Sequence, residues 1–138
     1  MEQKDQKIGK YEKDGSEQVI GALIEVHRAL APGLLESAYE ACLCHELRLR
    51  GLTFERQRAV GITYKGLTID CGYRVDVLVE GRIVVELKAI ERLLALHAAQ
   101  LLTYMKLLTV SIGLLVNFNV TSMRQGLRRL SLPPPPPS

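Results

Sequence analysis

The sequence predicts an α/β domain in which a mixed central sheet is flanked by helices. Three observations support this fold class. Apolar residues alternate on both sides of Glu80-Gly81, which is typical of a β-hairpin. Apolar residues recur with helical spacing before this hairpin and again from Leu93 to Leu108. A long apolar run, Ser111–Asn119, then indicates a strand that is buried on both faces.

Length and composition favour one domain between two polar ends. The chain has 138 residues, enough for one hydrophobic core, and its 47% hydrophobic residues exclude a disordered chain. We expect the domain to span residues 17–132. Residues 1–16 form a polar lead of mixed charge, and residues 133–138 form a proline-rich tail with polyproline II character.

Two helices are expected before the sheet. Ser16 is a candidate N-cap for an amphipathic helix over Glu17–Leu30. His27 lies within this helix and is expected to be packed or solvated rather than catalytic. Ala31-Pro32-Gly33 ends the helix, and Gly33 meets a backbone requirement there. A second helix is expected from about Leu34 to Arg50.

The strands follow the second helix. Residues 52–64 are interpreted as one strand that is kinked near Gly61, and Lys65-Gly66 as a turn. The next strand is expected to begin at Leu67 and to continue through Val79 into the hairpin. After the buried strand, Met123–Leu130 is expected to form a short helix or a turn.

Three ionisable residues interrupt the apolar hairpin. Glu86 and Lys88 are two apart on one strand and share a face, and antiparallel pairing brings Asp76 close to Glu86. Buried charges are unfavourable unless they are paired or bind a metal. Two carboxylates suit Mg²⁺, which prefers hard oxygen ligands. The spacing equally allows a structural pair of Lys88 with a carboxylate, and Asp70 is an alternative to Asp76.

Gln100 and Tyr104 add a polar pair on the following helix. They are four residues apart, so they lie on one helix face about one turn from each other. Their side chains can hydrogen-bond a phosphate or the edge of a nucleobase. A tyrosine at helical spacing is also common in a core, and both interpretations stay open on spacing alone.

These motifs resemble two related groups of proteins. The succession of Asp76, Glu86-x-Lys88 and Gln100-x3-Tyr104 resembles the PD-(D/E)XK nuclease superfamily, in particular its RecB-like branch. Gly33, Glu36 and Tyr39 spell G-x2-E-x2-Y, which resembles the GxxExxY family within that superfamily. The resemblance extends from about residue 19 to residue 130 and contains several motifs in the same order.

The resemblance implies a restriction-endonuclease-like core and a metal-dependent nuclease that acts on nucleic acid, with DNA favoured. Asp76 and Glu86 would hold Mg²⁺ or Mn²⁺, Glu36 would support the metal or a water, and Lys88 would activate the water. Gln100 and Tyr104 would position the substrate. Without the resemblance, Glu36 is better explained as a glutamate near a helix N-terminus that compensates the helix dipole. Tyr39 either orients Glu36 or packs in the core.

Other functions and partners stay open. The fold could serve a non-catalytic module that binds nucleic acid or protein, or the proline tail could dock a partner, and a homo-oligomer is compatible with both. The net charge of +3 permits nucleic-acid binding without demanding it. Aromatic residues make up only 5%, which leaves little material for reading single strands by stacking. Four basic residues could face phosphates or solvent: Arg56, Arg58, Lys65 and Arg74.

The cellular compartment is also an expectation from the sequence. No run of 18 apolar residues is present, so no membrane span is expected. The charged N-terminus lacks an apolar signal core. The three cysteines, Cys42, Cys44 and Cys71, have no zinc-site spacing, and their odd number fits a reducing compartment. We therefore expect a cytoplasmic protein.

Overall fold

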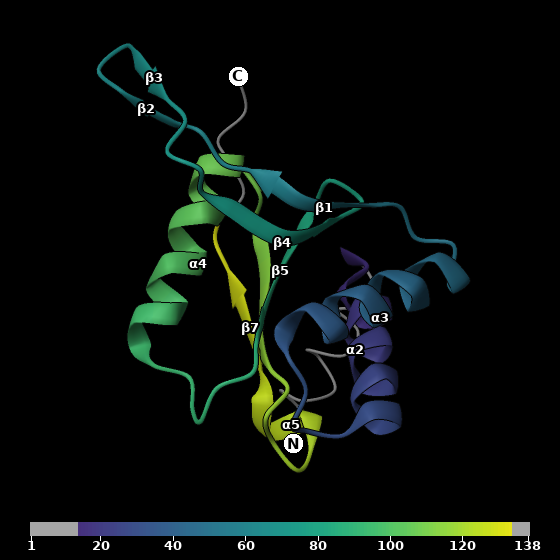
Figure 1. Cartoon of the computed structure of the whole chain (residues 1–138). Helices are drawn as coiled ribbons and strands as arrows, with labels where there is room; N and C mark the ends of the chain where they lie inside the picture. Colours follow the sequence, from purple (N-terminus) through teal and green to yellow (C-terminus); the bar gives the residue numbers. More distant parts are fainter. Residues whose placement is uncertain (1–13, 134–138) are drawn as a thin grey trace.

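The computed structural model describes residues 14–133 and shows a mixed α/β fold, as the sequence predicts. A five-stranded sheet has the order β1-β4-β5-β6-β7, and strands β2 and β3 form a separate two-stranded ribbon (Figure 1). Among the described strands only the β5–β6 pair is parallel, and helix α4 supplies the crossover connection that a parallel pair requires. The other neighbours in the sheet are antiparallel.

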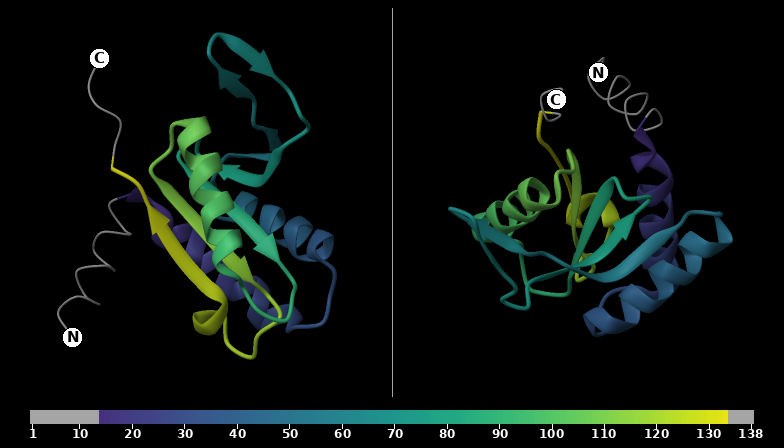
Figure 2. Two further views of the ribbon diagram at one scale, coloured as in Figure 1. Left: turned by 90° about the vertical axis from the view of Figure 1, so that its left-hand side faces the viewer. Right: turned by 90° about the horizontal axis from the view of Figure 1, so that it is seen from above.

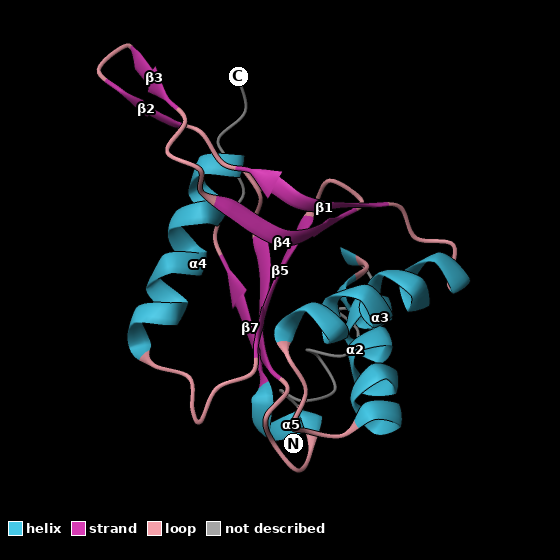
Figure 3. Ribbon diagram, viewed as in Figure 1, coloured by secondary structure: helices cyan, strands magenta, loops and turns pink. Residues whose placement is uncertain are grey.

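Figure 3 distinguishes the helices, the strands and the loops that join them. The helices are α2 (Ser16–Leu30), α3 (Glu36–Leu49), α4 (Ala95–Leu108) and α5 (Met123–Gly126). The strands are β1 (Phe54–Ala59), β2 (Ile62–Tyr64), β3 (Leu67–Ile69), β4 (Arg74–Val79), β5 (Ile83–Lys88), β6 (Ile112–Asn117) and β7 (Leu127–Ser131).

The sheet has an apolar cluster on each face. Helices α2 and α3 pack together on one side, and α4 lies on the other side (Figures 1 and 2). On the α2–α3 side, odd-numbered β5 residues such as Val85 and Leu87 join the core. On the α4 side, Val84 packs with Leu101 and Met105. Because side chains alternate along β5, Glu86 belongs to the α4 side.

The β4–β5 hairpin confirms the predicted centre of the sheet. Glu80 and Gly81 both have positive φ, 54° and 65°, and Arg82 N–H donates to Val79 C=O at 2.9 Å. This is the geometry of a type I′ turn, whose twist matches the twist of antiparallel strands. Neighbouring strands flank the hairpin on both sides, and five of the six β5 residues are buried.

The segment between β1 and β4 differs from the prediction. The kink near Gly61 is a full break, so β2 leaves the sheet instead of continuing β1. The expected continuous strand from Leu67 to Val79 is wrong, because it is interrupted between β3 and β4. Asp70 accepts a hydrogen bond from Gly72 N–H at 2.9 Å, and Gly72 has a φ of 79°. Such a local turn competes with strand pairing.

Two other expectations need correction. Gly15, not Ser16, is the N-cap of α2, and the Ser16 hydroxyl donates to Asp14 at 2.7 Å. The segment Met123–Leu130 begins as the short helix α5, but its second half forms the edge strand β7. The β7 sequence LRRLS lacks an apolar run, because only one partner strand, β6, is beside it.

The α2–α3 connection explains two residues of the G-x2-E-x2-Y motif. Gly33 has a φ of 110°, a conformation that other residues rarely adopt, which confirms its backbone role. Tyr39 is buried, and its hydroxyl donates to Ala31 C=O at 2.6 Å and accepts from Leu34 N–H at 3.1 Å. Its ring stacks on Phe118 at 4.2 Å. Tyr39 therefore fixes the connection and packs in the core.

Most of the polar lead (residues 1–13) and of the tail (134–138) lies outside the described residues. His27 is packed as expected, with Nε2 at 2.7 Å from the Val120 carbonyl oxygen. Between residues 14 and 133, no helix has the length and apolar character needed to cross a membrane.

Candidate functional site

Asp76 and Glu86 meet at the centre of the sheet, as predicted. The Asp76 backbone N–H donates to Glu86 Oε1 at 2.9 Å, and the Leu87 N–H donates to Asp76 Oδ2 at 2.8 Å. Each carboxylate thus takes a backbone donor from the opposite strand of the hairpin. The paired residues of the β4–β5 ladder begin one position closer to the turn, at Val77 and Val85. At this position the carboxylates accept hydrogen bonds from backbone N–H groups, in place of the backbone carbonyls of the facing strand. These contacts hold the two carboxylates close together.

Glu86 is buried in an unfavourable electrostatic environment. Its side chain is 7% exposed, and this burial, together with the Asp76 carboxylate, raises its pKa from 4.5 to about 7. The Asp76 N–H and the Lys88 ammonium act in the opposite direction, and the Glu36 carboxylate raises the pKa slightly further. A cation bound here would relieve the repulsion between the carboxylates, and their hard oxygens suit Mg²⁺ or Mn²⁺.

Lys88 follows Glu86 on the same side of β5 and is half-buried. No ion pair within 4.0 Å and no side-chain hydrogen bond joins its ammonium to another residue in the range 14–133. The alternative of a close structural pair with a carboxylate is therefore not what the structure contains. The Lys88 charge still acts on Glu86 from a distance, because it lowers the pKa of that carboxyl.

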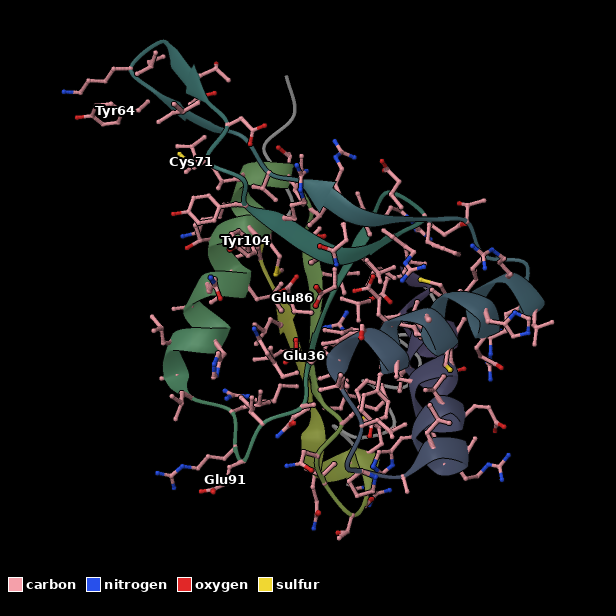
Figure 4. All side chains as sticks on the ribbon, in the orientation of Figure 1. Glu36, Tyr64, Cys71, Glu86, Glu91 and Tyr104 are labelled. Carbon is pink, nitrogen blue, oxygen red and sulfur yellow. The ribbon has the colours of Figure 1, made fainter. Side chains whose placement is uncertain are left out.

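Glu36 lies at the start of α3, beside the end of β5. Its Oε2 accepts a hydrogen bond from Ala89 N–H at 3.2 Å, and its charge acts on Glu86. Figure 4 shows Glu36 and Glu86 between α3 and α4, with Tyr104 on the α4 side. Among residues 14–133, no three His, Cys, Asp or Glu side chains are close enough together to form a metal site. Asp76 and Glu86 are thus a two-carboxylate pair, with Glu36 nearby.

Gln100 and Tyr104 lie on one face of α4, as their spacing predicts. Gln100 Nε2 donates to the Tyr104 hydroxyl at 3.0 Å. Tyr104 is 8% exposed, and burial raises its pKa, with a further contribution from the Glu86 carboxylate. Gln100 is exposed. The pair therefore reaches from the solvent to the carboxylates, and Tyr104 belongs to both the core and the site.

A network that the sequence did not reveal supports Asp76 from the other side. Gln57 Nε2 donates to Asp76 Oδ1 at 3.2 Å and to Glu40 Oε1 at 2.9 Å. Glu40 is 8% exposed, and its other oxygen accepts from Arg56 Nε at 3.1 Å. The Gln57 backbone has a φ of 50°, unusual for a residue other than glycine, and the β1–β4 register skips it. The register is the same on both sides of this gap, so Gln57 lies opposite Asp76 at an unpaired position, and its amide reaches that carboxylate.

One signal could have pointed to Glu40. It follows Glu36 by four residues on the same helix, so both carboxylates share one helix face. Gln57 carries no comparable signal, because its role depends on the backbone break opposite Asp76.

The other candidates are separate from the carboxylate pair. Asp70 lies in the loop before β4, where it binds Gly72 N–H, so Asp76 is the aspartate that meets Glu86. Arg56 and Arg58 form ion pairs with Glu40 and Glu55. Lys65 and Arg74 are therefore the basic residues of the predicted phosphate-facing patch that have no such partner within residues 14–133.

The comparisons with known proteins agree with this arrangement. A family model described as the PD-(D/E)XK nuclease superfamily matches residues 13–130, which is most of the chain. No curated protein and no solved structure matches the chain. The matched range contains the positions of the carboxylate pair, Lys88 and the Gln100–Tyr104 pair.

Proposed function

Since this chain belongs to the PD-(D/E)XK nuclease superfamily, we propose that it is a divalent-metal-dependent nuclease that hydrolyses phosphodiester bonds of nucleic acid, with DNA favoured. One observation supports the proposal most. Two carboxylates share the buried centre of a sheet, and the pKa of Glu86 is raised to about 7. A pair that repels itself in this way weakens the fold unless a cation binds it, which is typical of a functional site.

Asp76 and Glu86 would hold Mg²⁺ or Mn²⁺ through their oxygens. When bound, the ion would neutralise phosphate charge and make water a stronger nucleophile. Leu87 N–H and Gln57 Nε2 hold Asp76 through different oxygens, so its orientation is set before any ligand arrives. Such fixed orientation of a metal ligand is a general way to increase affinity.

Lys88 would stabilise the negative charge that develops on the phosphate oxygens, and it would orient the attacking water. Its ammonium has no close ion pair among residues 14–133, so it is available for this role. Glu36 would hydrogen-bond a water beside the pair or support the ion. Gln100 and Tyr104 would bind the substrate strand, since their amide and hydroxyl groups suit phosphate oxygens.

A cleavage assay tests the proposal. The wild-type protein, Asp76→Asn and Lys88→Met would be incubated with single- and double-stranded DNA and RNA in Mg²⁺, in Mn²⁺ and in EDTA. We expect metal-dependent cutting by the wild type and a loss of about 100-fold or more in both variants, the range for removing one charge-stabilising group. Asp70→Asn is the matched control, because this second aspartate of the same segment lies in a solvent-exposed loop. It should cut like the wild type.

Two outcomes would contradict the proposal. Cutting that survives in both Asp76→Asn and Lys88→Met would place the activity elsewhere. An absence of cutting on every substrate, together with nucleic-acid binding that is equal with and without metal, would favour a non-catalytic binding module.

A further inference from the structure

The β2–β3 ribbon, which we call the arm, presents an apolar face to solvent. Its paired residues put four apolar side chains on one face, and Thr63 and Thr68 on the other. These four are Ile62, Tyr64, Leu67 and Ile69. Tyr64 and Leu67 are about 60% exposed. Two-stranded ribbons are marginal in water, so an exposed apolar face on one indicates a binding surface.

A cleft at the base of the arm connects this face to α4. Its volume is about 230 Å³, and it is lined by Ile62, Tyr73, Gln100, Thr103, Tyr104 and Leu107. The ring centroids of Tyr73 and Tyr104 are 6.2 Å apart, with an interplanar angle of 46°. The volume is below the roughly 300–1,000 Å³ of sites that enclose a whole small molecule. It suits one flat group that belongs to a longer ligand.

The cleft adjoins the carboxylate pair. Tyr104 belongs to both, because it lines the cleft and its hydroxyl feels the charges of Glu86 and Asp76. Figure 4 shows Tyr64 on the arm and Glu86 in the sheet, with Tyr104 between them. A ligand with a ring in the cleft can therefore place its next groups beside Asp76 and Glu86.

The charge of the arm and of the strand ends beside it favours an anionic ligand. Residues 56–74 contain four basic residues and one acidic residue, Asp70. Arg56 and Arg58 are paired with glutamates, whereas Lys65 and Arg74 form no ion pair with any residue in 14–133. Lys65 Nζ lies 5.3 Å from the centre of the Tyr64 ring. Aromatic rings beside free cations are the combination that binds unpaired nucleic-acid strands.

We propose, on the basis of the proposed nuclease function, that the cleft between Tyr73 and α4 receives an unpaired nucleobase of the substrate, so that the protein prefers single-stranded nucleic acid to a duplex. In a duplex the base faces are already stacked on each other and cannot enter the cleft. Two of the five tyrosines, Tyr73 and Tyr104, line the cleft, so the low aromatic content does not prevent stacking at one position. A single stack gives little sequence preference.

The experiment measures binding in EDTA, where no metal-dependent cutting occurs. Fluorescent DNA and RNA oligonucleotides, single-stranded or hybridised to their complement, would be titrated by anisotropy at one salt concentration. We expect single strands to bind at least ten times more tightly than the duplex. Tyr73→Ala should weaken single-strand binding by roughly 5- to 150-fold, the range for losing one base–aromatic stack, and leave duplex binding unchanged.

Two variants serve as controls for this loss. Tyr73→Phe keeps the ring and should bind like the wild type. Leu49→Ala removes an exposed apolar side chain from the end of α3 and should have no effect. Tyr73 is itself 43% exposed, so its truncation is compatible with folding. A 2-aminopurine base in the single strand should lose fluorescence on binding to the wild type and to Tyr73→Phe, but not to Tyr73→Ala.

The result separates this inference from the nuclease proposal. Equal affinity for single strands and duplex, or unchanged binding of single strands by Tyr73→Ala, would contradict the proposed role of the cleft. This holds even if cutting depends on Asp76. Tyr73-dependent binding of single strands without any cutting would support the cleft and contradict the nuclease. Sedimentation would detect a dimer, and dimerisation that Tyr73→Ala abolishes while nucleic-acid binding is unchanged would assign the apolar face to a second copy instead.

Discussion

The β4–β5 hairpin and the β2–β3 arm are built alike and placed in opposite environments. Each has a two-residue turn ending in glycine with two positive φ values, Glu80-Gly81 in one and Lys65-Gly66 in the other. The hairpin is buried between neighbouring strands and contains the charged residues Asp76 and Glu86. The arm projects from the sheet and has a face of exposed apolar residues (Figure 1).

The difference teaches where to look for function. Local sequence determines that both segments form hairpins, because turn and alternation agree in each. In both segments the polarity of some side chains does not suit their surroundings. The hairpin has charged side chains in a buried position, and the arm has apolar side chains exposed to solvent. Such inconsistencies reduce stability and are expected mainly at functional sites. The predictions below use matched changes in the two hairpins, or around them, to test this interpretation.

The largest effect on stability is expected from a matched pair of leucines. Leu87 in β5 is 1% exposed, and Leu67 in the arm is 60% exposed. Leu87→Ala should lower the free energy of unfolding by about 2–5 kcal/mol, because it leaves a cavity in the core. Leu67→Ala should change it by less than about 0.5 kcal/mol. Urea unfolding followed by circular dichroism measures both, and similar losses would contradict the contrast between the two hairpins.

The next effect is the pH dependence that Glu86 gives to the metal-free protein. Its pKa is about 7 in the folded state and near 4.5 in the unfolded chain. Between these values the folded state binds more protons, so stability is highest below pH 4.5 and falls as the pH rises to about 7. The loss is up to about 3 kcal/mol. Glu86→Gln should remove this part of the pH profile.

Unfolding in urea with EDTA at several pH values measures this dependence. Glu91→Gln is the control, since Glu91 is exposed in the loop after β5 (Figure 4) and should leave the profile unchanged. A stability difference between wild type and Glu86→Gln that does not vary from pH 5 to pH 8 would contradict the raised pKa of Glu86.

A smaller effect is expected from Gln57, which holds Asp76 from strand β1. Gln57→Ala should weaken Mn²⁺ binding by about 10-fold or more, the lower end for losing a group that orients a metal ligand. Calorimetric titration measures it. Gln18→Ala is the control, because this glutamine contacts Arg50 away from the site. Equal Mn²⁺ affinity in all three proteins would mean that Gln57 does not help Asp76 to bind the metal.

The smallest effect is expected from the arm's cation. Lys65→Ala should weaken binding of single-stranded oligonucleotides uniformly across sequences and reduce the slope of log affinity against log salt by about 1. Lys106→Ala, in the last turn of α4, provides the comparison. If both variants reduce the slope equally, the arm has no special role in binding phosphates.

The parts predicted from the sequence are those with strong local signals. The β4–β5 hairpin follows from its alternation and turn, and strand spacing places Glu86 and Lys88 on one side. The Gln100–Tyr104 contact follows from helical spacing. These relations involve neighbours in one element or across one tight turn, so no tertiary information is needed to expect them.

The parts that were missed depend on tertiary contacts. Gln57 reaches Asp76 because the β1–β4 pairing is interrupted at these two residues, and such a break leaves no composition signal in FERQRA. The edge strand β7 is mostly polar, which concealed it. The residues on both sides of Asp70 and Gly72 are typical of strands, so the sequence predicts one continuous strand there. The turn that these two residues form therefore has no clear signal, and the arm is predicted as part of the sheet.

The central claim is that Asp76 and Glu86 form one divalent-cation site. Calorimetric titration of Mn²⁺ at pH 7 into wild type, Asp76→Asn and Asp70→Asn tests it most directly. We predict binding to wild type and Asp70→Asn with release of protons, because Glu86 has a pKa of about 7 and must ionise fully to bind. Asp76→Asn should show at least a tenfold loss of affinity. Equal affinity in Asp76→Asn and the wild type would contradict the claim.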